Sequence, residues 1–151
     1  MKRALIALLV LILPAGNAMN LSNIERDINQ AVDELVRKEG DGWFMIIEDP
    51  RTRKFIQFAW GATEGFIFDL PSQALDQIEL QRAKEVLSNY DIVLETWAVY
   101  DRPNGKVVGE QSGFNKDIGD APELAKKIAL DVFKEVYRVD PKTDLGVTIE
   151  K

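Results

Sequence analysis

Acidic side chains are the main candidates for chemistry in this sequence, and three of them stand beside apolar runs in its first half. Glu48 and Asp49 end one run, and Asp69 lies within a later one. Two carboxylates on one sheet can work as a general acid and a general base if their environments separate their pKa values. The sequence gives no sign that these groups meet, and Asp49, directly before Pro50, has a sufficient role as the first residue of a turn. We therefore predict no catalytic residue, and a small carboxylate-based enzyme is the least favoured function.

The 151 residues include no histidine and no cysteine. Their absence removes the commonest general base and zinc ligand, all thiol nucleophiles and all disulfides. Isolated glycines do not form a phosphate-binding loop. The spacing of four neighbouring acids matches no known calcium loop: Glu39, Asp41, Glu48 and Asp49. The prediction is therefore that the chain holds no metal and no cofactor.

The charge balance argues against a nucleic-acid partner. Lys and Arg number 19 against 25 Asp and Glu, which gives a net charge of −6, and no basic stripe interrupts the acidic excess. Such an excess keeps a small protein soluble, and it would also suit a basic protein partner. The length is that of one domain with a sizeable core.

The first 18 residues have the three-part layout of a secretory signal peptide. Residues 1–3 are basic, residues 4–13 are apolar, and small residues precede a cleavage site after Ala18. The apolar block is shorter than the about 20 residues that cross a bilayer as a helix. We therefore expect export to the periplasm or secretion, with no membrane attachment after cleavage and with residues 19–151 as the mature domain. The alternatives are an uncleaved anchor, or translation from Met19, which would leave the protein in the cytoplasm.

Three short apolar runs within residues 43–70 predict the centre of a sheet. The runs WFMIIE, FIQFAW and FIFDL are rich in Phe, Ile and Trp, which favour strands. The segments EDPRTRK and GATEG between them carry the proline and glycines of turns. Loops this short join antiparallel neighbours, so the runs are expected to form a meander.

Three helices are predicted from three capping boxes, each followed by apolar residues at three- and four-residue spacing. The N-cap and N3 pairs of these boxes are Ser22 with Glu25, Asp76 with Glu79, and Asp120 with Glu123. We expect the helices to end before Gly40, near Leu87 and before Pro141.

Two further strands are predicted after the second helix. Residues 92–100 form one of them, and the Arg-Pro-Asn-Gly sequence at 102–105 is typical of a hairpin loop. Residues 106–111 are polar and interrupted by glycine, which suits a strand at a sheet edge, and 112–119 are expected to be loop. The alternation at 145–149 would allow a short sixth strand. The predicted fold is α+β, in the order helix, three strands, helix, two strands, helix, with a five-stranded, mainly antiparallel sheet packed with helices.

Both faces of this sheet carry large apolar residues. Neighbouring side chains in a strand point to opposite faces, and Glu48, Gln57, Asp69 and Glu95 should mark the outer one. Apolar residues of the same parity form a candidate patch for binding a partner: Phe44, Ile46, Phe55, Ile67 and Trp97. The competing explanations are that a helix covers this face, or that a β-bulge shifts the assumed parity.

The run FMIIEDPRTRKFIQFAW followed by FIFDLPSQALDQIELQRA, together with the order of elements, resembles the type III secretion chaperone-like superfamily, often called TY-Chap. The resemblance covers residues 21–137. It implies a non-enzymatic α+β domain, frequently dimeric, that binds a protein segment, and it supplies no catalytic residue. The secretion chaperones proper act in the cytoplasm, whereas this chain is expected to be exported.

The expected function is therefore a non-catalytic protein-binding domain, chaperone-like or adaptor, with a protein partner or a second copy of itself. A small, acidic, exported protein without catalytic residues would also fit a periplasmic inhibitor or immunity protein that neutralises a delivered toxin.

Overall fold

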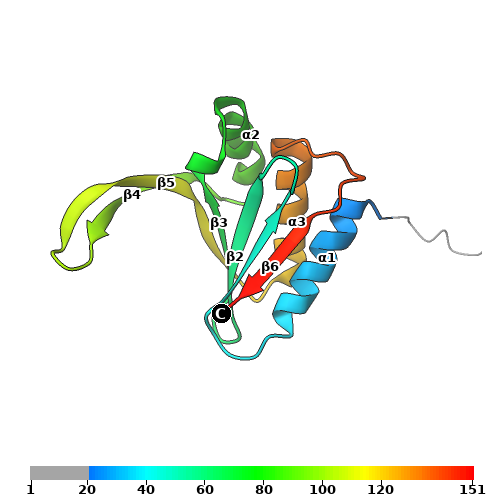
Figure 1. The fold of residues 1–151 in the computed structure, drawn as a ribbon, viewed down its shortest axis with the longest axis horizontal. Helices are drawn as coiled ribbons and strands as arrows, with labels where there is room; N and C mark the ends of the chain where they lie inside the picture. The colour runs from blue at the N-terminus through cyan, green and yellow to red at the C-terminus, as the bar shows by residue number, and fades with distance from the viewer. Residues whose placement is uncertain (1–20) are drawn as a thin grey trace, which may run out of the picture.

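The computed structural model describes residues 21–151, so the predicted signal peptide at residues 1–18 lies outside the described residues (Figure 1). The elements in chain order are α1 (Asn23–Val36), β1 (Trp43–Glu48), β2 (Phe55–Gly61), β3 (Gly65–Pro71), η1 (Ser72–Ala74), α2 (Gln77–Ser88), β4 (Leu94–Asp101), β5 (Lys106–Gly119), α3 (Pro122–Asp131), η2 (Val132–Val136) and β6 (Gly146–Glu150). The predicted α+β class is confirmed.

One antiparallel sheet contains the six strands, in the spatial order β4-β5-β3-β2-β1-β6. The sheet therefore has one strand more than the five predicted, because the C-terminal β6 pairs with β1. The meander of β1, β2 and β3 forms as the short turns predicted. Alternating apolar residues are a weak signal near a chain end, and only the pairing with β1 fixes β6 in place.

The strand β5 corrects one further prediction. Residues 112–119, expected to be loop, continue β5 to a length of 14 residues, and Gly113 to Gly119 pair with β3. β5 therefore lies between β3 and β4 over this part, whereas residues 106–111 pair with β4 alone and have a free edge, as predicted. The polar residues of the stretch 112–119 misled the prediction because Asn115 and Asp117 point to an exposed face while Phe114 is buried.

The core lies between the inner face of the sheet and the helices. The fully buried side chains of the central strands all have one parity: Met45, Ile47, Ile56, Phe58, Phe66, Phe68 and Leu70. The apolar stripe of α1 and the buried residues of α2, α3 and η2 belong to the same cluster. The helices lie together on one side of the sheet (Figure 1).

The helix starts follow the predicted capping only in part. Asp76 and Glu79 make both bonds of a capping box, and the Ser22 side chain accepts from the backbone N–H of Glu25 at 3.3 Å. The third box is wrong: α3 has Ala121 as its N-cap and makes no side-chain cap bond. Pro122 begins this helix, and this places Asp120 one residue too early to cap it.

Strands β4 and β5 extend beyond the rest of the sheet as a curved two-stranded ribbon (Figure 1). β5 pairs with β3 only from Gly113 onward, whereas its pairing with β4 begins at Lys106. We call residues 96–112, which comprise these two strand segments and the loop between them, the arm. Within the described chain, the arm's backbone pairs only with itself.

Candidate functional site

The five predicted patch residues lie on the outer face of the sheet, opposite the helices. Phe44 stands beside Ala59, which stands beside Ile67, so three strands contribute one row across this face. Ile46 occupies the next row, and Phe55 lies opposite Glu48. Phe44 is 37% exposed, and Ile46, Phe55 and Ile67 are half-buried.

Neither competing explanation for the apolar outer face applies to the central strands. The registers of β1 with β2 and of β2 with β3 run without a bulge, so the parity holds. Among residues 21–151, the helices pack on the inner face and leave the outer face uncovered. The register shifts of this sheet fall elsewhere, between β3 and β5 and within the arm.

Trp97 joins the arm to the outer face. Its indole lies directly over Gly113 of β5, so that a Cβ at Gly113 would come within 3.1 Å of the Trp97 ring. Gly113 thus leaves room for the indole, whose ring reaches from the arm back toward β3. Trp97 remains 38% exposed and borders the outer face at the base of the arm.

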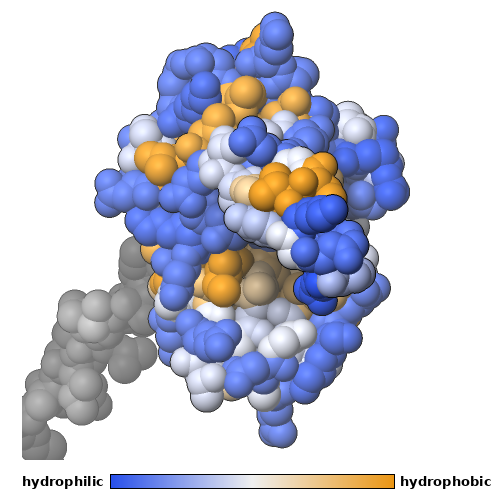
Figure 2. Space-filling view, turned by 90° about the vertical axis from the view of Figure 1, so that its left-hand side faces the viewer, coloured by the Kyte–Doolittle hydropathy of each residue, from blue (hydrophilic) through white to orange (hydrophobic). Residues whose placement is uncertain are grey.

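A hollow of about 260 Å³ opens on the outer face, and we call it the outer-face groove. Its lining includes Phe44, Gln57, Ala59, Ile67, Asp69 and Asn115. Figure 2 looks onto this side of the molecule, with the arm projecting toward the viewer and apolar surface in the recess beneath it. The sheet and the arm therefore form the two sides of one concave surface.

A polar cluster lies in the middle of this apolar surface. Asp69 accepts a hydrogen bond from the Gln57 amide on one oxygen and from the Asn115 amide at 3.4 Å on the other. The three side chains come from β2, β3 and β5, and the sheet register brings them into one row. Sequence reasoning identified Gln57 and Asp69 only as markers of the outer face and missed Asn115, because its stretch was expected to be loop.

The three candidate catalytic carboxylates are engaged by separate partners. Glu48 forms an ion pair with Arg53 at 2.9 Å, and Asp69 bonds the two amides. Asp49 is buried in the turn after β1, where it accepts from the backbone N–H of Arg51 and from the Thr52 hydroxyl, both at 3.0 Å. Burial alone would raise the pKa of Asp49, but these hydrogen bonds outweigh it and hold the pKa below its usual value.

Two tyrosines with raised pKa values have structural partners. Burial is the main cause of the raised pKa of Tyr137, whose hydroxyl donates to the carbonyl of Phe55 at 2.6 Å. Burial likewise raises the pKa of Tyr90, which donates to Asp131 while Lys127 donates to it at 3.0 Å. These contacts tie the helices to the sheet and to one another.

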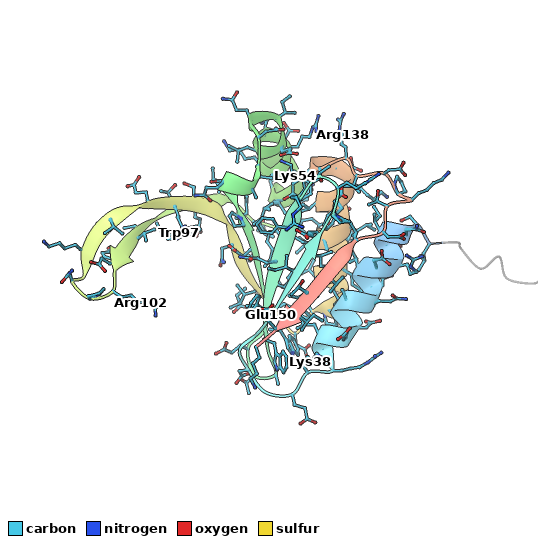
Figure 3. All side chains as sticks on the ribbon, in the orientation of Figure 1. Lys38, Lys54, Trp97, Arg102, Arg138 and Glu150 are labelled. Atoms are coloured by element: carbon cyan, nitrogen blue, oxygen red, sulfur yellow. The ribbon has the colours of Figure 1, made fainter. Side chains whose placement is uncertain are left out.

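The described residues contain no group of three or more acidic side chains placed to hold a metal ion. The charged residues labelled in Figure 3 are likewise dispersed: Arg102 lies at the arm, Lys54 and Arg138 beside the helices, and Lys38 and Glu150 at the opposite end of the sheet. These five labelled residues therefore do not converge on one site.

The outer face carries acidic residues, and the end of the arm carries basic ones. Four carboxylates of the outer face form no ion pair among residues 21–151: Asp69, Glu95, Asp117 and Glu150. Arg102 and Lys106, which flank the hairpin loop, form none within the same part of the chain either. With Asp101 included, residues 100–108 have a net charge of +1, opposite in sign to these four carboxylates.

Fold and surface define a class, an α+β domain with one helix-covered and one open sheet face. Comparisons with protein-family models, curated proteins and solved structures find no match for this chain. None of the helices within residues 21–151 has the length and apolar character needed to cross a membrane.

Proposed function

We propose that this chain is a non-catalytic protein-binding domain, chaperone-like or adaptor, that receives its partner in the outer-face groove. The observation that carries the proposal is the apolar row of Phe44, Ala59 and Ile67, which the described residues leave uncovered. Contiguous apolar surface of this kind on a folded domain marks a site of interaction. The resemblance to the secretion chaperone-like superfamily supports the same function.

The groove suits a polypeptide better than a small molecule. It is shallow and open, and its apolar row is crossed by the amide and carboxylate groups of Gln57, Asp69 and Asn115. Small-molecule sites are usually enclosed and bury most of their ligand. A protein segment can cover the apolar row while its backbone bonds to the polar one.

Ala59 offers the sharpest test because it is exposed in the centre of the apolar row. Ala59→Arg fills the groove with a long charged side chain without entering the core. The matched control is Ile78→Arg on α2, where the wild-type side chain is 63% exposed and belongs to the helical side. Circular dichroism and urea unfolding should show that both variants fold like the wild type.

The binding readout is capture by the tagged mature chain, residues 19–151, in an envelope extract of the cells that make it. We expect the wild type and Ile78→Arg to retain the same bound protein and Ala59→Arg to lose it. A bound protein that Ala59→Arg still captures would refute the groove as the site. Capture of a basic toxin would select the inhibitor or immunity function over the chaperone-like one.

We further propose that the protein is exported and that its mature form begins at Met19. The basic, apolar and small-residue zones of residues 1–18 support this proposal. Mass spectrometry of the native protein should find Met19 as the first residue in the periplasmic or secreted fraction. The same start in the cytoplasm would indicate internal translation, and an intact Met1 in the membrane would indicate an anchor.

A further inference from the structure

The arm exposes three large apolar side chains near its end. Tyr100 and Val107 face each other across the two strands, and Val108 follows at a register shift. They are 60%, 58% and 64% exposed respectively. A two-stranded ribbon is at best marginally stable in water by itself. An extended ribbon with three large exposed apolar residues near its end is therefore suited to docking on another surface.

The charges indicate which surface this is. The end of the arm, residues 100–108, carries the bases Arg102 and Lys106 and one acid, Asp101, so its net charge is +1. Arg102 and Lys106 have no ion-pair partner within residues 21–151. The outer face around the groove carries carboxylates that form no ion pair among residues 21–151, including Asp117 beside Ile67 and Glu150 beside Phe44. A basic end with apolar flanks and an apolar groove with an acidic border are complementary.

The arm is long enough to reach a facing molecule. The seven residues 106–112 of β5 span about 20 Å at about 3.3 Å per residue, whereas two sheets packed face to face lie about 10 Å apart. An arm of this length extends from one sheet past the outer face of another. Docking into its own groove would require the ribbon, which extends away from the rest of the sheet, to fold back over the outer face.

We propose that the partner in the groove is a second copy of this chain, and that two copies exchange arms. Each copy places the end of its arm, with Tyr100, Arg102, Lys106 and Val108, against the outer-face groove of the other. Because every copy carries both surfaces, the exchange closes as a symmetric dimer with two identical contacts. This inference rests on the proposed function, since it assigns a partner to the same groove.

The mass of the mature chain in solution gives the first test. Light scattering and sedimentation velocity at micromolar concentrations should show twice the chain mass for the wild type and for Ile78→Arg. Ala59→Arg should be monomeric. In a second variant, the arm replacement, Asn-Gly takes the place of residues 98–110 and joins Trp97 to Gln111. These two residues face each other across β4 and β5, so a two-residue turn can connect them. The arm replacement should also be monomeric.

Mixing experiments test the exchange itself. The double variant Arg102→Glu with Lys106→Glu has a defective arm and an intact groove, whereas Ala59→Arg has the reverse. Each alone should be monomeric, but an equimolar mixture should form a heterodimer through one intact contact. Adding Asp117→Lys and Glu150→Lys to the arm double variant should restore the homodimer. A dimer formed through any surface other than arm and groove would show neither effect.

Three results would overturn the exchange, and they have different consequences for the groove. A wild-type monomer that captures another protein through Ala59 would remove the second copy as partner and leave the protein-binding function intact. A wild-type dimer that persists in Ala59→Arg and in the arm replacement would assign dimerisation to another surface. A wild-type monomer without groove-dependent capture would refute both proposals.

Discussion

Neighbouring residues of the central strands lie on opposite faces of the sheet and serve different roles. On β2, Ile56 and Phe58 are fully buried under the helices, whereas Ala59 is exposed and Phe55 is half-buried on the other side. Both faces are apolar, but only the inner one is packed within the described chain. Stability therefore resides in the inner face, and the outer face is left free to carry a binding surface.

The arm extends the same contrast to the edge of the molecule. Phe114, at the end of β5 that pairs with β3, is fully buried, whereas residues 106–111 of the same strand are all exposed. One strand thus changes from a core element to an exposed ribbon within a few residues. Regions with few buried contacts open at low free-energy cost. The arm should accordingly contribute little to the stability of the isolated domain.

The largest expected effect compares a phenylalanine from each face. Phe58→Ala removes a fully buried ring that contacts Phe66 and Phe68, with ring centres 6.0 and 5.5 Å away. It should lower the free energy of unfolding by about 3–5 kcal/mol. Phe44→Ala on the outer face should cost about 1 kcal/mol, because the ring is already partly exposed.

Urea unfolding monitored by circular dichroism, at protein concentrations where the chain is monomeric, measures both values. Equal losses in Phe58→Ala and Phe44→Ala would mean that the outer face is as tightly packed as the inner one. The contrast between the two faces would then be wrong.

A medium effect on the free energy of unfolding is expected at the turn between β1 and β2. Substitutions on the outer face should cost little, but Asp49 in this turn is buried. Asp49→Asn removes a charged acceptor that holds Arg51 and Thr52, and it should cost about 1–3 kcal/mol at neutral pH. The pKa of Asp49 in the folded protein lies below its ordinary value of 3.8. Its carboxylate therefore stabilises the fold above that pH, and the contribution is lost as the pH falls through the folded pKa.

Unfolding free energies of the wild type and Asp49→Asn at pH 7 and at pH 3 check this sign. The difference between the two proteins should shrink at the lower pH. A difference that stays constant would show that the charge of Asp49 is irrelevant and that only the shape of the turn matters.

The smallest effect is expected for the arm. The arm replacement removes residues 98–110 but retains the buried Phe114 and its pairing with β3 and β4. At concentrations where the chain is monomeric, it should change the free energy of unfolding by less than about 1 kcal/mol. A loss of several kcal/mol would show that the arm belongs to the core-forming part of the sheet.

Local pattern alone predicted the elements whose signals are short in range. The meander of β1 to β3 follows from apolar runs and turn residues, and the box of Asp76 and Glu79 fixes the start of α2. The parity of the outer face also followed, because side-chain alternation is a property of any strand. Phe44, Ile46, Phe55, Ile67 and Trp97 were thereby assigned to one face from sequence.

Pairing between distant segments could not be predicted in the same way. β6 becomes a strand by pairing with β1, and the second half of β5 does so by pairing with β3. The residues of these two segments are too few or too polar to predict a strand by themselves. The network of Gln57, Asp69 and Asn115 depends on those pairings, since its members come from three strands. The third capping box failed because Pro122 determines where α3 begins.

The sequence by itself determined the α+β class, the central meander and the set of apolar residues that share the outer face, because these depend on periodicity and turn chemistry within a few residues. Only the tertiary structure decided that all the helices pack on one side, that β5 continues outward as an arm, and that the groove lies beneath it. The physical reason is that these features arise from the burial of the helices' apolar faces and from the backbone pairing of strands far apart in the chain.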